Sequence, residues 1–239
     1  MSNGVKIDLF GIKFDNLTMD EAIKQLEKSL PAGRQRFVVL PYSEFVVRAQ
    51  KDEKFKNILN SADFCLCEGR GLYLSAKILG KKIKTNIYGV DLIYNIVKIF
   101  QFPKIFLFGA TQDVIMKTTE KLGEKIVGFE NGYQNYNQVI QKINSIQPNI
   151  LLVGLGSPKQ EEFIYENLDK MPSVKLAIGV GGAFDFISGK IKRAPKIVQK
   201  IGLEWLWRLI LESRRISRIF IGVGGLIYLT FKNVLYLKK

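Results

Sequence analysis

One stretch of the chain, residues 149–163, constrains the possible folds more than any other. Its residues 150–154 form a short apolar run, which predicts a strand buried on both faces. Gly154 and Gly156 follow, and glycine allows a sharp turn where a side chain would clash. The next residues, Ser-Pro-Lys-Gln, are typical of a helix start, so this stretch predicts a strand–loop–helix unit.

The predicted helix start gives three residues specific roles. We expect Ser157 to be the N-cap, Pro158 the first helical residue and Gln160 the partner that closes a capping box. The free amides and positive dipole end of such a helix face the edge of the sheet. Two interpretations remain open, a well-capped structural helix and a site for an anion.

A second glycine-rich strand end follows downstream. Residues 176–182 read Leu-Ala-Ile-Gly-Val-Gly-Gly, and Asp185 comes shortly after them. Two such strand ends in one chain suggest a phosphate-bearing ligand at the carboxyl edge of a parallel sheet.

The order of the expected elements predicts the fold class. From residue 104 onward short apolar strands alternate with amphipathic helices, which indicates an α/β fold with a Rossmann-like, parallel, doubly wound sheet. We expect residues 1–195 to form this core domain and residues 196–239 to form a basic, apolar C-terminal appendage that is helical and associates with membranes.

Composition excludes several kinds of chemistry. The chain has no histidine, so catalysis by Ser-His-Asp or Cys-His is excluded, and a general base must be a carboxylate, a lysine or a tyrosine. No Asp-x-Asp pair is present, so we expect no metal and no cofactor. Cys65 and Cys67 lie in an apolar run and are expected to be buried thiols. Together with a polar N-terminus lacking a signal peptide, they indicate a reducing cytoplasm.

The positive charge is concentrated near the C-terminus. Residues 190–239 hold twelve Lys and Arg against two Glu, a net +10 of the +14 of the whole chain. Such a tail suits nucleic acid, an anionic membrane or a polyphosphate substrate. Residues 202–211 predict an amphipathic helix, and the uncharged run 219–231 is too short to span a bilayer comfortably. We interpret the run as an interfacial segment; the alternative is a helix packed on the domain, and no nucleic-acid module is apparent.

Polar residues follow several of the expected strands and should converge at one crevice: Tyr42, Ser43, Glu44, Glu68, Ser157, Lys159, Gln160 and Asp185. Glu68 is the best candidate for a general base, because a carboxylate at the end of a buried strand would be partly desolvated and its pKa raised. A solvated loop charge or a helix N-terminal acid is the alternative for Glu68.

Several long motifs resemble one family. Residues 150–161 (I-L-L-V-G-L-G-S-P-K-Q-E), residues 177–195 and the G-L-E-W-L-W-R-L run from Gly202 resemble the WecG/TagA/CpsF glycosyltransferases, as do shorter matches at Ala49, Ala62 and Gly89. The resemblance covers nearly the whole chain. It implies an inverting, metal-independent transfer of an N-acetylmannosamine-type sugar from a UDP donor to undecaprenyl-diphosphate-linked GlcNAc. The pathways implied are teichoic acid, enterobacterial antigen or capsule assembly, at the inner face of the plasma membrane.

The resemblance also implies roles for single residues. Glu68 stands where the family has an aspartate base, and Gln160 is the glutamine of its P-K-Q-E motif, with a catalytic role and a capping role both open. Donor-binding residues are expected to be Gly109, Gly156, Ser157, Pro158, Lys159, Gly179, Gly181, Gly182, Asp185 and Arg193. The acceptor is expected to contact Tyr42, Ser43, Asn86 and Tyr88. The appendage arginines Arg208, Arg214, Arg215 and Arg218 are expected to complete the site over the donor diphosphate and to meet the anionic membrane.

The chain departs from the family pattern in its first half. The T-P-N motif reads Leu40-Pro41-Tyr42, and the R-V-T-G motif reads Asn86-Ile87-Tyr88-Gly89. We hypothesise an active transferase with an altered acceptor or sugar, rather than a decayed, membrane-associated binding protein. A dinucleotide-binding oxidoreductase is a further rival, but no G-x-G-x-x-G follows a first strand. A homo-oligomer stays open.

Overall fold

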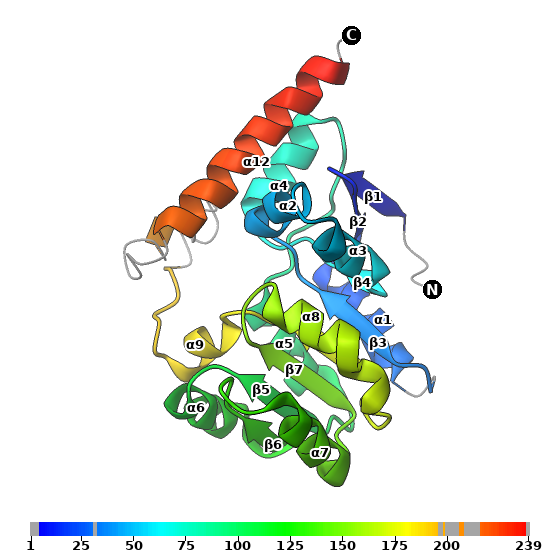
Figure 1. Cartoon of the computed structure of the whole chain (residues 1–239), viewed down its shortest axis with the longest axis vertical. Helices are drawn as coiled ribbons and strands as arrows, with labels where there is room; N and C mark the ends of the chain where they lie inside the picture. Colours follow the sequence, from blue (N-terminus) through cyan, green and yellow to red (C-terminus); the bar gives the residue numbers. More distant parts are fainter. Residues whose placement is uncertain (1–4, 31–32, 196–197, 199–205, 208–215, 238–239) are drawn as a thin grey trace.

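The computed structural model describes residues 5–30, 33–195, 198, 206–207 and 216–237. Its centre is a six-stranded parallel sheet with the strand order β4-β3-β8-β7-β5-β6 (Figure 1). The strands are β3 (Arg36–Val39), β4 (Phe64–Cys65), β5 (Ile105–Gly109), β6 (Ile126–Glu130), β7 (Ile150–Gly154) and β8 (Leu176–Gly179). The predicted α/β class with a parallel, doubly wound sheet is confirmed.

The central strands are buried on both faces, as their apolar runs predict. In β7 the residues Ile150–Val153 have no exposed surface. Alternate side chains along the strand enter two separate cores: Leu151 and Val153 lie in one, Ile150 and Leu152 in the other. Burial on two faces explains why these strands are continuously apolar instead of alternating with polar residues.

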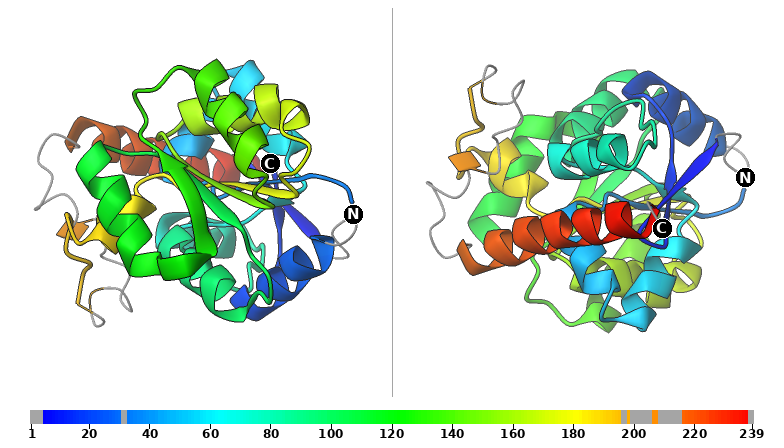
Figure 2. Two further views of the ribbon diagram at one scale, coloured as in Figure 1. Left: turned by 90° about the horizontal axis from the view of Figure 1, so that it is seen from below. Right: turned by 90° about the horizontal axis from the view of Figure 1, so that it is seen from above.

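Helices cover each face of the sheet. One core is closed by α2 (Ser43–Ala49), α3 (Glu53–Ser61), α4 (Arg70–Ile78), α7 (Tyr136–Ile146) and α8 (Lys159–Asn167). The other is closed by α1 (Met19–Ser29), α5 (Gly89–Ile99), α6 (Gln112–Leu122) and α9 (Ala183–Ser188). Figure 2 shows the two helical layers with the sheet between them.

Neighbouring strands send their helices to opposite faces, and this opens the edge of the sheet. The helix after β7, α8, lies on one face, whereas α6 after β5 and α9 after β8 lie on the other. Loops that diverge in this way leave a crevice at the carboxyl ends of the strands, where ligands bind in open α/β sheets.

An N-terminal hairpin was not predicted. β1 (Lys6–Leu9) pairs antiparallel with β2 (Ile12–Asp15) through a turn in which Phe10 and Gly11 have φ of 58° and 80°. The Asp8 carboxylate accepts a hydrogen bond from the Gly11 amide (3.1 Å), which stabilises the turn. The buried Asp15 carboxylate accepts one from the Cys65 amide (2.8 Å), so the hairpin is fixed to the edge strand β4.

Two helix starts illustrate the local rules. A capping box begins α1: Thr18 accepts from the Glu21 amide and the Glu21 side chain accepts from the Thr18 amide. Thr111 occupies the N-cap position of α6, but its hydroxyl bonds to the Asp113 carboxylate and makes no capping bond to a backbone amide.

The C-terminal helix α12 (Ile216–Leu237) packs against α2 and α4 (Figures 1 and 2). Its Gly222 lies against the α2 backbone, where an added Cβ would be 3.2 Å from the Glu44 nitrogen. The hydroxyl groups of its buried Thr230 and of Ser75 in α4 are hydrogen-bonded at 2.9 Å. The apolar run 219–231 is therefore part of a longer helix that packs on the domain, the alternative considered for it. None of the helices in the described part of the chain has the length and apolar character needed to cross a membrane.

The described residues also include both cysteines. Cys65 and Cys67 are buried, free thiols, as predicted. Burial raises the pKa of Cys67 to about 12 and that of Cys65 well above its usual value. The expected helix at residues 202–211 lies outside the described residues, apart from Leu206 and Trp207.

Candidate active site

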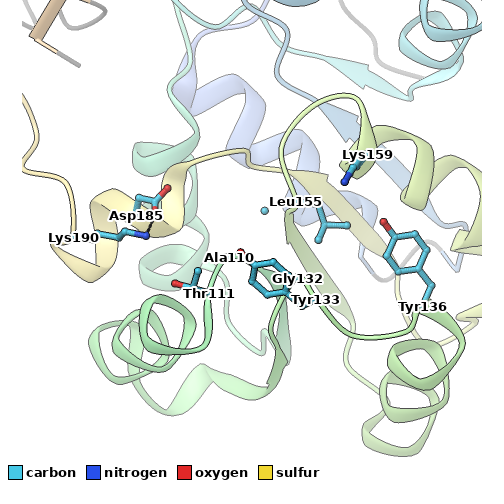
Figure 3. A pocket seen from close by; sticks show the side chains of 10 residues that line it. Ala110, Thr111, Gly132, Tyr133, Tyr136, Leu155, Lys159, Asp185 and Lys190 are labelled. Carbon is cyan, nitrogen blue, oxygen red and sulfur yellow. Dashed lines mark ion pairs between the residues drawn. The ribbon is translucent and has the colours of Figure 1, made fainter. Parts of the chain in front are cut away.

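A pocket of about 330 Å³ opens at the carboxyl ends of β5, β6 and β7. It is lined by residues from the loops after these strands and from α7, α8 and the α9 region: Ala110, Thr111, Gly132, Tyr133, Tyr136, Gly154, Leu155, Lys159, Asp185 and Lys190. Figure 3 shows Lys159 and Tyr136 on one side of the pocket and Asp185 and Lys190 on the other. This is the position expected for a ligand site in an open α/β sheet.

Cationic and aromatic side chains give the pocket its chemistry. Lys159 comes from the first turn of α8, and Lys190 lies 3.7 Å from an Asp185 carboxylate oxygen. Tyr136 is held edge-on against the rings of Phe108 and Phe163, with centroid distances of 5.9 and 4.9 Å. Burial raises the pKa of the Tyr136 hydroxyl, so the group stays protonated and can donate a hydrogen bond. The pocket therefore offers ammonium groups for an anion and a fixed ring for a planar group.

The predicted glycines have packing roles around this pocket. An added Cβ at Gly109 would lie 2.4 Å from the Gly154 backbone, and one at Gly154 would lie 2.7 Å from the Phe184 ring. Gly156 and Gly181 have φ of 78° and 53° and open space beside their Cα atoms. Gly182 is the N-cap of α9. The glycines thus let two loops approach the sheet edge closely.

The start of α8 differs from the prediction. Its N-cap is Pro158, the first helical residue is Lys159, and no capping box forms. The Ser157 hydroxyl is buried and makes no capping bond; it interacts instead with the Glu161 side chain, where it lowers the pKa of that carboxyl group. The Gln160 side chain is taken by a tertiary contact, in which its Oε1 accepts a hydrogen bond from the Gly181 amide at 2.9 Å. A capping pattern read from local sequence could not include this distant partner.

Glu161, next to Gln160, carries a carboxyl group with no exposed surface. Its Oε1 accepts a hydrogen bond from Gln160 Nε2 at 2.6 Å. Burial raises the pKa of Glu161 to about 7, although the bond from Gln160 works in the opposite direction. No role was expected for Glu161, because the burial of an acid in the first turn of α8 is visible only in the structure.

Glu68 lies at the other end of the same sheet edge, after β4. Its Oε1 accepts a hydrogen bond from the Gly89 amide, the first amide of α5, at 2.9 Å. An added Cβ at Gly89 would be 3.7 Å from this oxygen and 3.5 Å from the Val180 carbonyl oxygen, so Glu68 lies close to the turn after β8. A backbone amide at a helix N-terminus stabilises the ionised carboxylate, the form that a general base needs.

Three of the predicted acceptor residues lie beside Gly69 or just before Gly89, the neighbours of Glu68; we call Glu68, Tyr42, Asn86 and Tyr88 the acceptor cluster. Tyr42 Cβ is 3.7 Å from the position of an added Cβ at Gly69, and its hydroxyl bonds to Glu44 at 3.2 Å. Tyr88 is the N-cap of α5, and Asn86 Nδ2 lies 3.5 Å from its hydroxyl. The side-chain oxygen Oδ1 of Asn86 is buried and has no hydrogen-bond partner among the described residues.

The other predicted residues lie nearby or outside the described part. Ser43 begins α2, with its hydroxyl 3.3 Å from the position of an added Cβ at Gly71. Arg193 pairs with both Asp91 carboxylate oxygens at 2.6 and 2.7 Å, which ties the segment after α9 to the first turn of α5. Arg208, Arg214 and Arg215 lie outside the described residues. Arg218 lies in α12 one turn before Gly222, without a described side chain.

Comparison with models of protein families assigns residues 7–239 to the glycosyl transferase WecG/TagA/CpsF family. The chain belongs to this family. A relative from Bacillus spizizenii strain W23 is 32% identical over 217 residues, which cover 87% of this chain and 84% of that protein. One from Staphylococcus aureus strain NCTC 8325 / PS 47 is 28% identical over 228 residues, 91% of this chain and 89% of that protein. Both are named N-acetylglucosaminyldiphosphoundecaprenol N-acetyl-beta-D-mannosaminyltransferase.

The WecG/TagA/CpsF membership makes the protein a glycosyltransferase, as the motifs predicted. Lys159 and Asp185 of the pocket were predicted as site residues, whereas its lining residues Tyr133, Tyr136 and Lys190 were not. The Asn131-Gly132 pair, which follows β6, was an available signal, because Asn-Gly marks a turn and a turn after a parallel strand lies at the carboxyl edge.

Proposed function

We propose that this glycosyltransferase moves an N-acetylmannosamine-type sugar from a UDP donor to GlcNAc carried on undecaprenyl diphosphate. The names of the two relatives support the sugar and the acceptor. The structural observation that carries the proposal is the common edge of the sheet. A cationic pocket and a carboxylate held by a helix N-terminus both lie at this edge, with the turn after β8 between them.

The pocket is assigned to the donor. Lys159 and Lys190 lie where they can neutralise part of the charge of a diphosphate, and Tyr136 offers a ring for the nucleoside. Amides of the loops after β7 and β8 face the same edge and add donors for phosphate oxygens. We extend the donor site to Gly156, Ser157, Pro158, Gly181 and Gly182, which belong to these loops.

Glu68 is assigned as the general base. Its carboxylate takes the proton of the acceptor hydroxyl while that oxygen attacks the anomeric carbon of the donor sugar from the face opposite the nucleotide. The bond between the anomeric carbon and the β-phosphate oxygen breaks, and UDP leaves with the electron pair. The anomeric configuration is therefore inverted. Arg208, Arg214, Arg215 and Arg218 are assigned to the departing diphosphate.

The acceptor cluster is where this chain departs from the family pattern, so we assign the acceptor GlcNAc to it. Tyr42 lies beside Gly69, Tyr88 precedes the Gly89 amide that binds Glu68, and the buried side-chain oxygen Oδ1 of Asn86 has unused hydrogen-bonding capacity among the described residues. Residues 85–88 contain no cation, and the ammonium group of the preceding Lys84 is bonded to Glu21 at 2.7 Å. We infer that these changes alter the choice of acceptor or sugar and leave the transfer chemistry intact.

A peripheral position on the inner face of the plasma membrane fits the outer side of α12. The helix is apolar on its packed side and also on its exposed side, and a helix that is apolar all round needs a second apolar partner. We define the apolar face by the exposed side chains of α12 and its neighbour α4: Phe220, Ile221, Ile227, Tyr228, Phe231 and Leu235, with Leu74 and Ile78. The exposed Lys77 and Lys232 on these helices suit anionic lipid.

The position of α12 supports a lipid-linked acceptor close to the proposed base. α12 passes the start of α2 at Glu44, which Tyr42 of the acceptor cluster contacts. A diphosphate-linked sugar whose lipid stays in the bilayer could thus reach Glu68. We accordingly treat residues 1–195 as the catalytic core and residues 196–239 as the appendage that joins it to the membrane.

A donor panel tests the proposed function. UDP release is measured with UDP-N-acetylmannosamine, UDP-GlcNAc and UDP-glucose, each with and without a short-chain lipid-diphosphate GlcNAc. The proposal predicts acceptor-dependent release with UDP-N-acetylmannosamine. Binding of UDP-sugars without turnover on this acceptor would instead identify a changed acceptor or a decayed site, and no binding of any UDP-sugar would contradict the assignment of the pocket.

A further inference from the structure

The buried pair Gln160–Glu161 connects the two halves of the site. Gln160 is 2% exposed and Glu161 is not exposed at all. Gln160 Nε2 donates to Glu161 Oε1, and the Gly181 amide donates to Gln160 Oε1, so one side-chain amide joins the start of α8 to the turn after β8. Buried polar groups of this kind are stable only when their hydrogen bonds are made.

Chemistry fixes the orientation of the Gln160 amide. The Gly181 amide can only donate a hydrogen bond, so the Gln160 carbonyl oxygen must face Gly181 and the NH₂ group then faces the Glu161 oxygen. Without the Glu161 acceptor, no group at position 161 would bind the NH₂ end of the Gln160 amide and favour its observed orientation. The space is also filled closely, because an added Cβ at Gly179 would lie 2.9 Å from Gln160 Nε2 and 3.0 Å from Glu161 Oε1.

The turn held by Gln160 continues to the proposed base. Val180, next to Gly181, has its carbonyl oxygen 3.5 Å from the position of an added Cβ at Gly89. The Gly89 amide in turn donates to Glu68. Along the sheet edge the neighbours are therefore Glu161, Gln160, the turn at 180–182, Gly89 and Glu68, joined by hydrogen bonds except between the turn and Gly89, which lie side by side.

We propose that Glu161 is a positioning residue: by fixing the Gln160 amide it holds the turn at 180–182, and this turn sets the place of Glu68 relative to the donor pocket. The inference rests on the proposed function. A shift of the base by about an ångström affects the transition state far more than donor binding, so the rate constant kcat should fall while KM for the UDP-sugar is kept.

The test compares Glu161→Leu, Glu161→Gln and Glu166→Leu in the UDP-release assay with the full chain. Leu fills the volume of Glu161 without an acceptor, whereas Gln keeps an oxygen for Gln160 Nε2. We expect Glu161→Leu to lower kcat at least about 30-fold with KM changed less than about threefold, and Glu161→Gln to stay within about threefold of wild type. Glu166, exposed in the same helix, is the matched control for Glu→Leu and should also stay within about threefold.

A folded Glu161→Leu variant with wild-type kcat, or one whose loss lies wholly in KM, would overturn the inference. If Glu161→Leu fails to fold, the exchanged pair decides. Gln160→Glu alone places two carboxyl groups together and should lower kcat. Adding Glu161→Gln supplies an NH₂ group, so the new carboxylate at position 160 accepts from this group and from the Gly181 amide, and most of kcat should be recovered. Failure of the exchange to recover kcat would also overturn the inference. Absence of turnover in the wild type would instead contradict the proposed function itself.

Discussion

Glu161 is a carboxyl group that folding removes completely from water. Burial raises its pKa to about 7, helped by the neighbouring Glu162 carboxylate and opposed by the hydrogen bond from Gln160. Its usual value in an unfolded chain is 4.5. Between these values the folded chain holds a proton that the unfolded chain has lost, so stability decreases as pH rises from 4.5 to 7.

This difference predicts an unusual effect of Glu161→Gln, which cannot ionise. The variant and the wild type should have similar free energies of unfolding near pH 4.5. Near pH 8 the variant should be more stable by up to about 3 kcal/mol, because it avoids the cost of a buried charge. Urea denaturation at the two pH values measures the difference. If the difference in free energy of unfolding between variant and wild type is the same at both pH values, Glu161 does not titrate in this range.

For single residues, the sequence predicted which side chains lie at the site better than it predicted their hydrogen-bond partners. Lys159 and Asp185 were expected at the site and line the pocket, because polar residues after parallel strands must come to one edge. Ser157 and Gln160 were expected to form a capping box and do not, because Gly181 competes for the Gln160 side chain. Local pattern contains no information about a partner 21 residues away.

At the scale of elements, the close approach of α12 to the core depends on its small residues. Gly222 faces the α2 backbone, which cannot move aside as a side chain can, whereas Gly224 faces open space. Gly222→Leu should therefore displace α12 and lower the free energy of unfolding by about 2 kcal/mol. Gly224→Leu, the same change two residues along, should leave it unchanged or raise it slightly, because Leu favours the helix more than Gly does. Equal effects of the two changes, measured by urea denaturation, would contradict the packing described.

The predicted elements succeeded where burial and periodicity agree. β7 has the predicted bounds, since a strand buried on both faces is apolar throughout its length. The hairpin β1–β2 was missed, because its Phe10-Gly11 turn lacks the usual Asn-Gly or Asp-Gly signal. The run 219–231 was ambiguous because an apolar helix face suits either a protein core or a lipid surface, and α12 presents both kinds of face.

At the scale of the whole molecule, the apolar face predicts binding to bilayers. We expect the full chain to float with vesicles that contain roughly one-third phosphatidylglycerol and to float less with pure phosphatidylcholine. Phe220→Ser combined with Phe231→Ser should reduce flotation on the anionic vesicles, because both side chains are more than 60% exposed on α12. Phe102→Ser, 79% exposed at the opposite edge of the sheet before β5, is the matched control. Equal flotation of all three proteins would show that the apolar face is not the membrane contact.

The account depends most on Glu68 as the group that takes the proton of the acceptor. Glu68→Gln keeps the size of the side chain and an oxygen for the Gly89 amide, but removes the basic carboxylate. With UDP-N-acetylmannosamine and lipid-linked GlcNAc, we predict that UDP release falls at least about 100-fold while the affinity for UDP is unchanged. Glu120→Gln, on the exposed side of α6, should release UDP at the wild-type rate. A Glu68→Gln variant that releases UDP as fast as the wild type would contradict the central claim.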